Sequence, residues 1–365
     1  MDVLAVMSRH DHEQVVFCNE PAVGLKAIIA IHDTTLGPSL GGCRFYPYPT
    51  EEQALSDVLR LSRAMTYKAS LAGLNLGGGK SVIIGDPETD RSEALFRAFG
   101  RCVDGLGGRY ITAADVNTSV TDMEWVRRET QYVTGLPETL GSSGDPSPVT
   151  AYGVLVGIKA AVMTQLDIDN LRGIKVAVQG VGHVGRNLCR LLREAGAELF
   201  ISDINQAAAD GVVAELGATW VDHREIHAAP VDVLAPCAMG GALNEVTIPE
   251  IKASIIAGAA NNQLARPTTD GEALYRRGIL YAPDYAVNAG GLINLANELE
   301  GYDRKRALAK VEGIHDTLMR IFRMSAEEER PTHQVADGLA EGRIRQAAGG
   351  KSMHPATAVR TAERQ

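Results

Sequence analysis

The most informative segment of the chain is Val176-Ala177-Val178-Gln179-Gly180-Val181-Gly182-His183-Val184-Gly185. The apolar residues at its start predict a buried strand, and the amphipathic pattern that continues through Arg193 predicts a helix. Between them stands a G-x-G-x-x-G motif. Gly180 allows the turn, Gly182 lets the backbone approach a pyrophosphate, and Gly185 lets helix and strand pack closely. We therefore predict a dinucleotide site with the pyrophosphate at the helix N-terminus and contacts from the intervening Val181, His183 and Val184.

An acidic residue further along indicates which dinucleotide is bound. Asp203 ends the next predicted strand, 23 residues after Gly180. A carboxylate there accepts hydrogen bonds from the ribose hydroxyls and repels a 2′-phosphate, so we expect NAD rather than NADP. We interpret His183 as a solvent-facing position of the motif and not as a catalytic base. The alternative is a glycine turn followed by an unrelated surface acid.

The sequence around the motif predicts two α/β domains. Strands are expected at 175–179, 198–202, 231–235, 254–257 and 278–281, mostly separated by helical patterns, which is typical of a Rossmann-type, doubly wound parallel sheet. The segment 135–148 is rich in Gly, Ser and Pro and predicts a domain junction. The expected organisation is an N-terminal α/β domain at 1–135, a junction at 136–149, the NAD-binding domain at 150–290, and C-terminal helices at 291–365 that return toward the first domain.

The elements of the first domain follow from its hydrophobic periodicity. Strands are predicted at 14–18, 25–32, 82–84 and 110–113, and helices at 51–69, 94–106 and 121–129, the first with Thr50 as its N-cap. A further helix is predicted at 150–164. Beyond Asn288 the pattern is helical, with breaks near Pro331 and Gly349-Gly350.

Composition excludes several classes of function. The chain has 365 residues, 45% of them hydrophobic, and a formal net charge of -9, which argues against a nucleic-acid partner. No apolar run approaches the roughly 18 residues that span a bilayer, and the start of the chain lacks the basic region of a signal peptide. The five cysteines show no C-x-x-C spacing, so we expect reduced thiols rather than disulfides or metal ligands. We expect a cytoplasmic protein with no metal site and no membrane partner.

Three residues of the first domain suggest chemistry. Lys68 lies near the end of a predicted helix, and Lys80 follows three glycines whose missing side chains leave room for a close approach by ligand or backbone. Asp115 comes just after a predicted strand, at the kind of position where ligand sites gather in α/β domains. On spacing alone, a site built from two lysines and an aspartate and a set of solvated surface charges both remain open.

A longer segment shows a resemblance to a known family. Leu74-Asn75-Leu76-Gly77-Gly78-Gly79-Lys80-Ser81-Val82-Ile83-Ile84-Gly85-Asp86-Pro87 resembles the active-site signature of the glutamate/leucine/phenylalanine/valine dehydrogenases. The similarity extends over nearly the whole chain and is greatest to leucine dehydrogenases, which segments 27–38, 282–285 and 288–291 also fit. The resemblance implies reversible, NAD-dependent oxidative deamination of a branched-chain aliphatic L-amino acid (leucine, valine or isoleucine) to the 2-oxo acid and ammonia.

The resemblance also implies roles for individual residues. Lys68 pairs with the substrate carboxylate, helped by the backbone near Gly41 and Gly42. Lys80 binds and activates the attacking water, and Asp115 exchanges protons with the departing amine. A lysine with its free pKa of about 10.4 is a poor base near neutral pH, so we expect burial and the cation of Lys68 to lower the pKa of Lys80.

Further positions concern the cofactor and the substrate side chain. The resemblance implies that Thr150 contacts the nicotinamide carboxamide and that Asn262 fixes the substrate near the ring. The side-chain pocket maps to four apolar residues, which disfavour the buried carboxylate of glutamate: Leu40, Ala113, Leu292 and Leu295. Leucine dehydrogenases commonly have valine at the last two positions and threonine where this chain has Cys43, which we interpret as a packing residue.

Several alternatives stay open at this point. Leu292 and Leu295 narrow the pocket and favour valine or 2-aminobutyrate over leucine, although one methylene contributes only ~1–3 kcal/mol of discrimination. A dehydrogenase of 2-hydroxy acids would need a catalytic His and a substrate-binding Arg, a pattern that Lys68 and Lys80 do not fit. A non-catalytic, NAD-binding regulatory protein would bind NADH without turnover. The resemblance implies a homo-oligomer, with dimer and octamer both open.

Overall fold

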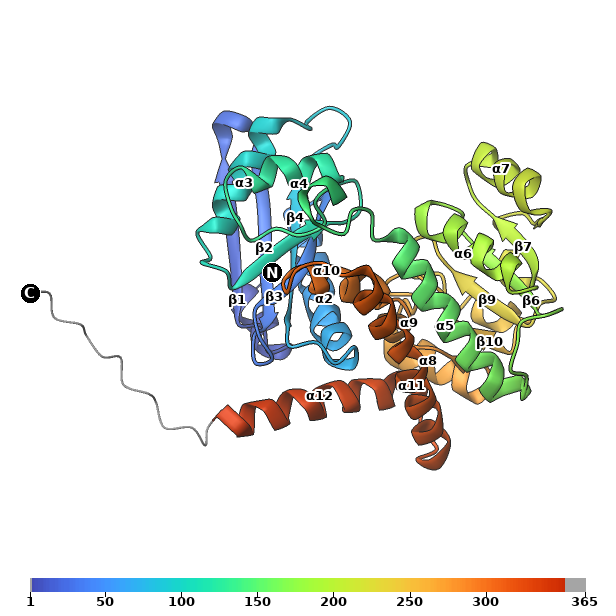
Figure 1. The fold of residues 1–365 in the computed structure, drawn as a ribbon. Coiled ribbons are helices and arrows are strands. Elements are labelled where there is room, and N and C mark those ends of the chain that lie inside the picture. Colours follow the sequence, from blue (N-terminus) through green and yellow to red (C-terminus); the bar gives the residue numbers. More distant parts are fainter. Residues whose placement is uncertain (1, 352–365) are drawn as a thin grey trace, which may run out of the picture.

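The first domain is a five-stranded sheet with helices on both faces (Figure 1). The computed structural model describes residues 2–351. The sheet has the order β1-β2-β4-β3-β5, in which β1–β2 and β2–β4 are antiparallel and β3 is parallel to both β4 and β5. Its strands are β1 (Gln14–Glu20), β2 (Leu25–Asp33), β3 (Ser39–Tyr46), β4 (Gly77–Ile84) and β5 (Tyr110–Ala114).

Alternation along β2 explains how the helices are divided between the two faces. Successive strand residues point to opposite faces. Ile29 and Ile31 pack with Phe96 of α3 (Glu93–Asp104), whereas Ala30 packs with Val58 of α2 (Glu51–Leu71). The predicted N-cap of α2 is confirmed, because the Thr50 side chain accepts a hydrogen bond from the backbone of Gln53. The remaining helices of this domain are α1 (Val3–Arg9) and α4 (Val120–Arg127).

The central strands β3 and β4 depend on glycine. A strand at 39–46 was not expected because Gly41 and Gly42 interrupt its pattern. A Cβ on Gly41 would stand 1.8 Å from the carbonyl oxygen of Gly79, so only glycine lets β3 lie this close to β4. Strand β4 starts at Gly77 and not at Val82, because the glycines belong to the sheet: a Cβ on Gly78 would stand 2.1 Å from the Thr66 nitrogen of α2. Lys80 is therefore inside a strand rather than at its start.

The second domain is a six-stranded sheet in which all pairs are parallel, in the order β11-β10-β9-β6-β7-β8. Its strands are β6 (Lys175–Gln179), β7 (Glu198–Ser202), β8 (Thr219–Trp220), β9 (Val233–Pro236), β10 (Ile255–Ile256) and β11 (Leu280–Tyr281), joined in part by α6 (His183–Glu194), α7 (Gln206–Leu216) and α8 (Pro267–Arg276). The predicted doubly wound parallel sheet is thus confirmed. From β6 the chain adds β7 and β8 on one side and then β9, β10 and β11 on the other, so the strand order reverses between β6 and β9. Sheets of this type bind ligands at the carboxyl ends of the strands where the order reverses.

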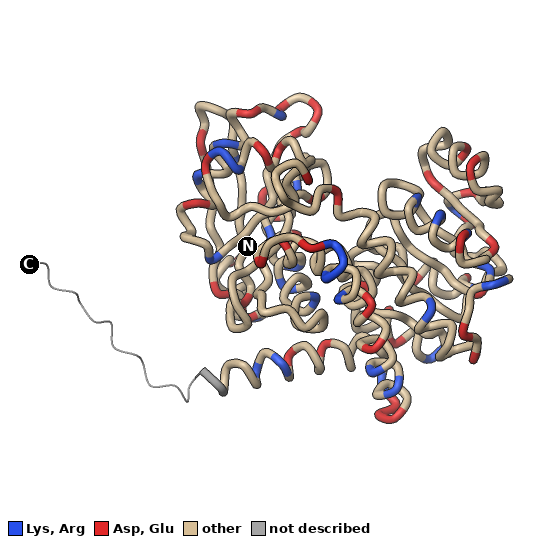
Figure 2. The backbone as a smooth tube through the Cα atoms, viewed as in Figure 1, with Lys and Arg blue, Asp and Glu red and all other residues tan. Residues whose placement is uncertain are grey.

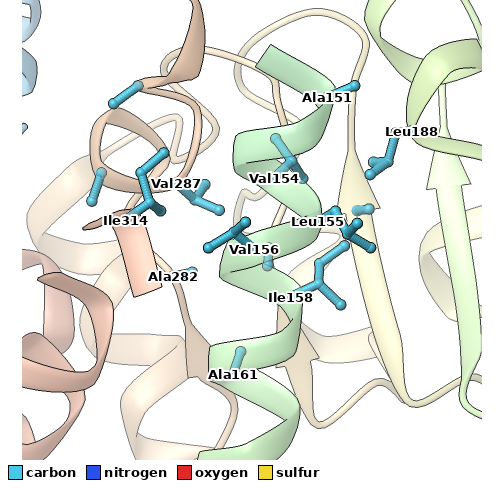
Figure 3. Packing of buried hydrophobic residues seen from close by; sticks show 14 of the residues in the cluster. Ala151, Val154, Leu155, Val156, Ile158, Ala161, Leu188, Ala282, Val287 and Ile314 are labelled. Carbon is cyan, nitrogen blue, oxygen red and sulfur yellow. The ribbon is translucent and has the colours of Figure 1, made fainter. Parts of the chain in front are cut away.

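Helix α5 (Ser147–Leu166) packs among buried hydrophobic residues of the neighbouring elements (Figure 3). It starts three residues before the predicted helix and therefore within the predicted junction. The rest of that junction, residues 136–146, contains a 3-10 turn at Glu138–Leu140 and no longer helix or strand. By length and composition α5 would suit a membrane span, but most of it is buried. Val154 and Ile158 belong to the main apolar cluster together with Leu188 of α6. It is therefore a core helix of the fold.

The C-terminal helices run back to the first domain (Figure 1). They are α9 (Asp284–Val287), α10 (Gly290–Glu298), α11 (Arg304–Glu327) and α12 (Thr332–Lys351). The break near Pro331 is confirmed, and α12 continues through Gly349 and Gly350 to Lys351, the last described residue, so the break expected near these glycines stays a prediction. Helix α12 lies along α2, where Ser70 Oγ donates to the Ala340 carbonyl (2.9 Å) and Arg343 donates to the Leu74 carbonyl (2.7 Å). Residues 352–365 of the predicted C-terminal region lie outside the described residues.

Charged residues of both signs are interspersed over both domains (Figure 2).

Helix α10 also reaches the segment that joins the domains. Glu298 at its end accepts hydrogen bonds from the Gly135 nitrogen (3.0 Å), Ser142 Oγ (2.5 Å) and the Ser143 nitrogen (3.0 Å). Because one carboxylate holds three points of the connecting segment, that segment is fixed against the C-terminal helices.

Candidate active site

The structure brings Lys80 and Asp115 together and places Lys68 close by. Lys80 projects from β4, and its Nζ lies 2.8 Å from Oδ1 of Asp115, which follows β5. Lys68 on α2 and Lys80 are 7% and 4% exposed. Burial is the main reason that the pKa of Lys68 falls to about 8; the charge of Asp284 opposes this shift and that of Lys80 adds to it. The three residues form a buried, charged cluster at the carboxyl end of β5.

Asp115 is held by a second cation that the sequence analysis did not anticipate. Arg44 Nε lies 3.1 Å from Asp115 Oδ2, the oxygen that Lys80 leaves free. Burial alone would raise the pKa of Asp115, but Lys80 and Arg44 hold it well below its usual range. The available sequence signal is the position of Arg44 two residues after Gly42, on the same face of β3. A Cβ on Gly42 would stand 2.7 Å from Asp115 Cβ, so glycine there makes room for the carboxylate.

The residue that contacts Lys68 from the second domain is Asn261. Lys68 Nζ donates to Asn261 Oδ1 at 3.0 Å, and Asn288 Nδ2 donates to the same oxygen at 2.9 Å. The sequence analysis named Asn262, which has a positive φ of 52° and lines a different cavity together with Tyr67 and Tyr285. Neighbouring side chains at such a turn point in different directions, and it is Asn261 that lies on Lys68.

The four residues predicted to surround the substrate side chain lie in the main apolar cluster, which also contains the buried side of α5. Leu40 on β3, Ala113 on β5, and Leu292 and Leu295 on α10 are all buried in it. A Cβ built on Gly135 would stand 3.4 Å from Leu295 Cδ2, so this leucine packs against the connecting segment. The cluster joins the first domain to the C-terminal helices.

The glycine motif has the geometry that a bound dinucleotide requires. Gly180 has φ of +96°, a conformation that L side chains rarely adopt. A Cβ on Gly185 would stand 2.0 Å from the Gly180 carbonyl oxygen, whereas one on Gly182 would meet nothing within 4 Å. The backbone therefore packs tightly at Gly185 and stays open at Gly182, beside the N-terminus of α6. The residues present fit NAD.

The other predicted cofactor residues lie around this turn and at the start of α5. The Val181 nitrogen donates to Asp203 Oδ2 at 2.8 Å, which places the acid at the turn. His183 is exposed, Val184 is half-buried and Val181 is buried. Thr150 lies in the first turn of α5, where its Oγ1 donates to the Pro146 carbonyl (2.9 Å) and a Cβ on Gly291 of α10 would stand 2.6 Å from that Oγ1.

Comparison with known proteins shows that the chain is similar to amino-acid dehydrogenases over most of its length. Residues 12–132 match the family domain described as "Glu/Leu/Phe/Val dehydrogenase, dimerisation domain", and residues 141–211 and 200–348 match "Glutamate/Leucine/Phenylalanine/Valine dehydrogenase". The leucine dehydrogenase of Geobacillus stearothermophilus is 54% identical over 344 residues, 94% of each chain. The L-tryptophan dehydrogenase of Nostoc punctiforme is 51% identical over 93% of this chain and 96% of its own length.

Solved structures lead to the same class. The crystal structure of L-tryptophan dehydrogenase from Nostoc punctiforme matches with a TM-score of 0.80 and 49% identity, covering 95% of this chain and 99% of that one. The fold and the site thus define an NAD-dependent amino-acid dehydrogenase. The chain belongs to the glutamate/leucine/phenylalanine/valine dehydrogenase family, in its leucine dehydrogenase branch.

Proposed function

We propose that the enzyme carries out the reversible, NAD-dependent oxidative deamination of a branched-chain aliphatic L-amino acid to the 2-oxo acid and ammonia. The observation that carries this proposal is the charged cluster of Lys68, Lys80 and Asp115 at the end of β5, where Ala113 belongs to an apolar cluster. The charged groups suit the α-carboxylate and the amine, and the hydrocarbon suits an aliphatic side chain. We assign the substrate to the first domain and NAD to the second.

Each charged residue has a task that its surroundings support. Lys68, as a cation, pairs with the α-carboxylate, helped by the backbone near Gly41 and Gly42. Gly180, Gly182 and Asp203 at the turn after β6 would hold NAD, which would supply the acceptor for the hydride of the substrate Cα. Lys80 then orients and activates the water that adds to the iminium carbon. Asp115, an ionised carboxylate 2.8 Å from Lys80, accepts and returns the protons of the departing amine.

The apolar cluster supports an aliphatic substrate. None of its four mapped residues carries a charge that would compensate a glutamate side chain, whose burial against hydrocarbon is costly. Family membership does not choose among the remaining amino acids, because the relatives include leucine, tryptophan and phenylalanine dehydrogenases. Leu292 and Leu295 support a narrow pocket, so valine or 2-aminobutyrate as preferred substrate is the alternative within the same chemistry.

The test is NADH formation by the purified enzyme with NAD and a panel of valine, leucine, isoleucine, 2-aminobutyrate, phenylalanine, tryptophan and glutamate. We expect the highest kcat/KM with a branched-chain amino acid. Highest activity with an aromatic or acidic amino acid would contradict the pocket assignment. Binding of NADH without turnover of any amino acid would favour the regulatory alternative.

We also propose that the protein works as a homo-oligomer in the cytoplasm. The description of its first domain as a dimerisation domain supports self-association, and the five free cysteines agree with a reducing compartment. Light scattering coupled to size-exclusion chromatography measures the mass of the assembly. A monomeric mass at working concentration would contradict the first part of this proposal.

A further inference from the structure

Arg44 stands between two carboxylates. Its Nε contacts Asp115 Oδ2 at 3.1 Å, and its Nη1 contacts Asp57 Oδ2 at 2.8 Å. Tyr48 completes the arrangement, because its hydroxyl donates to Asp57 Oδ2 at 2.6 Å. The Arg44 side chain is only 16% exposed. A half-buried arginine with two carboxylate partners and a fixed fork geometry has little freedom to move.

This arrangement fixes the orientation of Asp115. Lys80 occupies Oδ1 and Arg44 occupies Oδ2, so the carboxylate cannot rotate without losing an ion pair. The backbone is held as well: the Asp115 nitrogen donates to Thr118 Oγ1 at 2.7 Å, and Thr118 Oγ1 donates to the Cys43 carbonyl at 2.8 Å. Strands β3 and β5 pair through Cys43 and Ala114, which puts Arg44 directly beside Asp115.

We propose that Arg44, itself held by Asp57 and Tyr48, is a positioning residue of the reaction, which anchors Asp115 Oδ2 so that Oδ1 faces Lys80 and the reacting amine. The proposal rests on the role proposed above for Asp115. It explains why Asp115 needs a second cation. When Lys80 turns to the water and the substrate, a carboxylate without Arg44 would be left buried and unpaired, which is strongly unfavourable.

The charges around Asp115 indicate what Arg44 contributes. The groups that act on it are Lys80 from β4, Arg44 and Cys43 from β3, Lys68 from α2 and Tyr110 from β5. Burial alone would lower the pKa of Arg44, but Asp115 and Asp57 raise it above its ordinary value, so Arg44 stays charged at every working pH. Arg44 is therefore the permanent cation of the group, and it favours the ionised form of Asp115 in which the carboxylate can accept a proton.

The test compares Arg44→Gln, Arg44→Lys and Asp57→Asn with the wild-type enzyme. Arg101→Gln is the matched control, because Arg101 forms an ion pair with Glu20 (2.8 Å) on the surface of the same domain. For each variant kcat/KM is measured with a branched-chain amino acid across the acidic pH range, together with Tm and NADH affinity. A residue that only stabilises the fold would change Tm without moving the pH profile.

We expect Arg44→Gln to lower kcat by about a hundredfold, the lower end of what general acid–base groups contribute. We expect its acid limb to move up by about one pH unit, because one opposite charge has left Asp115. Asp57→Asn should lower kcat to a smaller extent, because Arg44 is then less firmly held, but it should not raise the acid limb, since Arg44 keeps its charge. Arg44→Lys should keep the acid limb and lose part of kcat, since lysine supplies charge without the fork. NADH affinity should not change.

Two results would overturn the proposal: an Arg44→Gln enzyme with the wild-type acid limb and kcat, or equal losses in Arg44→Gln and Arg101→Gln. If Arg44→Gln does not fold, Asp57→Asn decides, and an unchanged kcat in that variant counts against the positioning role. Asp115→Asn separates this proposal from the proposed function. Full activity of Asp115→Asn would remove the role of Asp115 itself, whereas an inactive Asp115→Asn beside unaffected Arg44 variants would remove only the role of Arg44.

Discussion

Lys68 Nζ and Asn261 Oδ1 lie 3.0 Å apart, although 193 residues separate them in the sequence. The contact joins helix α2 of the first domain to the loop after β10 of the second, and Asn288 donates to the same amide oxygen. The lysine assigned to the substrate carboxylate is thus oriented by the NAD-binding domain. Correct placement of the two domains is therefore part of what builds the carboxylate site.

We expect Asn261→Ala to raise the KM for the amino acid by roughly tenfold, the effect of losing one hydrogen bond to a charged group. Asn262→Ala is the matched control, because its side chain does not lie on Lys68, and it should change KM much less. Steady-state kinetics of both variants show which of the two asparagines supports substrate binding. A larger effect in Asn262→Ala would support the assignment made from the sequence.

The pH dependence of substrate capture should follow Lys68. Its pKa is lowered to about 8, so the cation that binds the carboxylate is present below this pH and is lost above it. We expect kcat/KM for the amino acid to fall as the pH rises through about 8. Arginine remains charged throughout this range, so Lys68→Arg should lose this limb, even if its affinity is lower. An identical alkaline limb in Lys68→Arg would show that another group is responsible.

Lys80→Ala should abolish turnover while leaving NADH binding intact. Its Nζ pairs with Asp115 and is the group proposed to orient the attacking water, whereas the glycine turn of the second domain belongs to a different sheet. Steady-state rates and NADH fluorescence titration give the two readouts. Near-normal kcat in this variant would exclude Lys80 from the chemistry.

Leu295→Val should shift the preference toward leucine. Shortening a buried side chain by one methylene makes room for one methylene of substrate, worth ~1–3 kcal/mol and hence about tenfold in relative kcat/KM. The control is Leu299→Val, one turn further along and 46% exposed. The ratio of kcat/KM for leucine and valine is the quantity to compare. An unchanged ratio would mean that Leu295 does not border the substrate side chain.

Much of the fold was predictable where each element carries its own signal. Strands β6 and β7 match their predictions residue for residue, since each is a short run bounded by turn residues. Strand β3 was missed because its glycines are explained only by neighbours distant in sequence, such as Gly79 beside Gly41. The short strands β10 and β11 were each predicted two residues too long, at 254–257 and 278–281.

Part of the site was predictable from the sequence because the resemblance to a known family extends over nearly the whole chain. Lys68 lies near the end of α2, Lys80 inside β4 and Asp115 just after β5, and the packing of α2 on the sheet brings them together. Arg44 was missed, since an ion pair between β3 and the end of β5 depends on register rather than on spacing. Asn261 was missed because the positive φ of Asn262 sets which of two consecutive asparagines reaches Lys68, and nothing in the local sequence reveals it.

The packing of α12 on α2 has a consequence for the order in which the molecule is completed during synthesis. The carbonyl groups of Ser70 and Leu74 receive hydrogen bonds from Arg343, which the ribosome adds some 270 residues later. Domains generally fold as units in the order of synthesis, but here the helix that carries Lys68 lacks its outer cover until the NAD domain has emerged. The first domain to be made is thus the last to be finished.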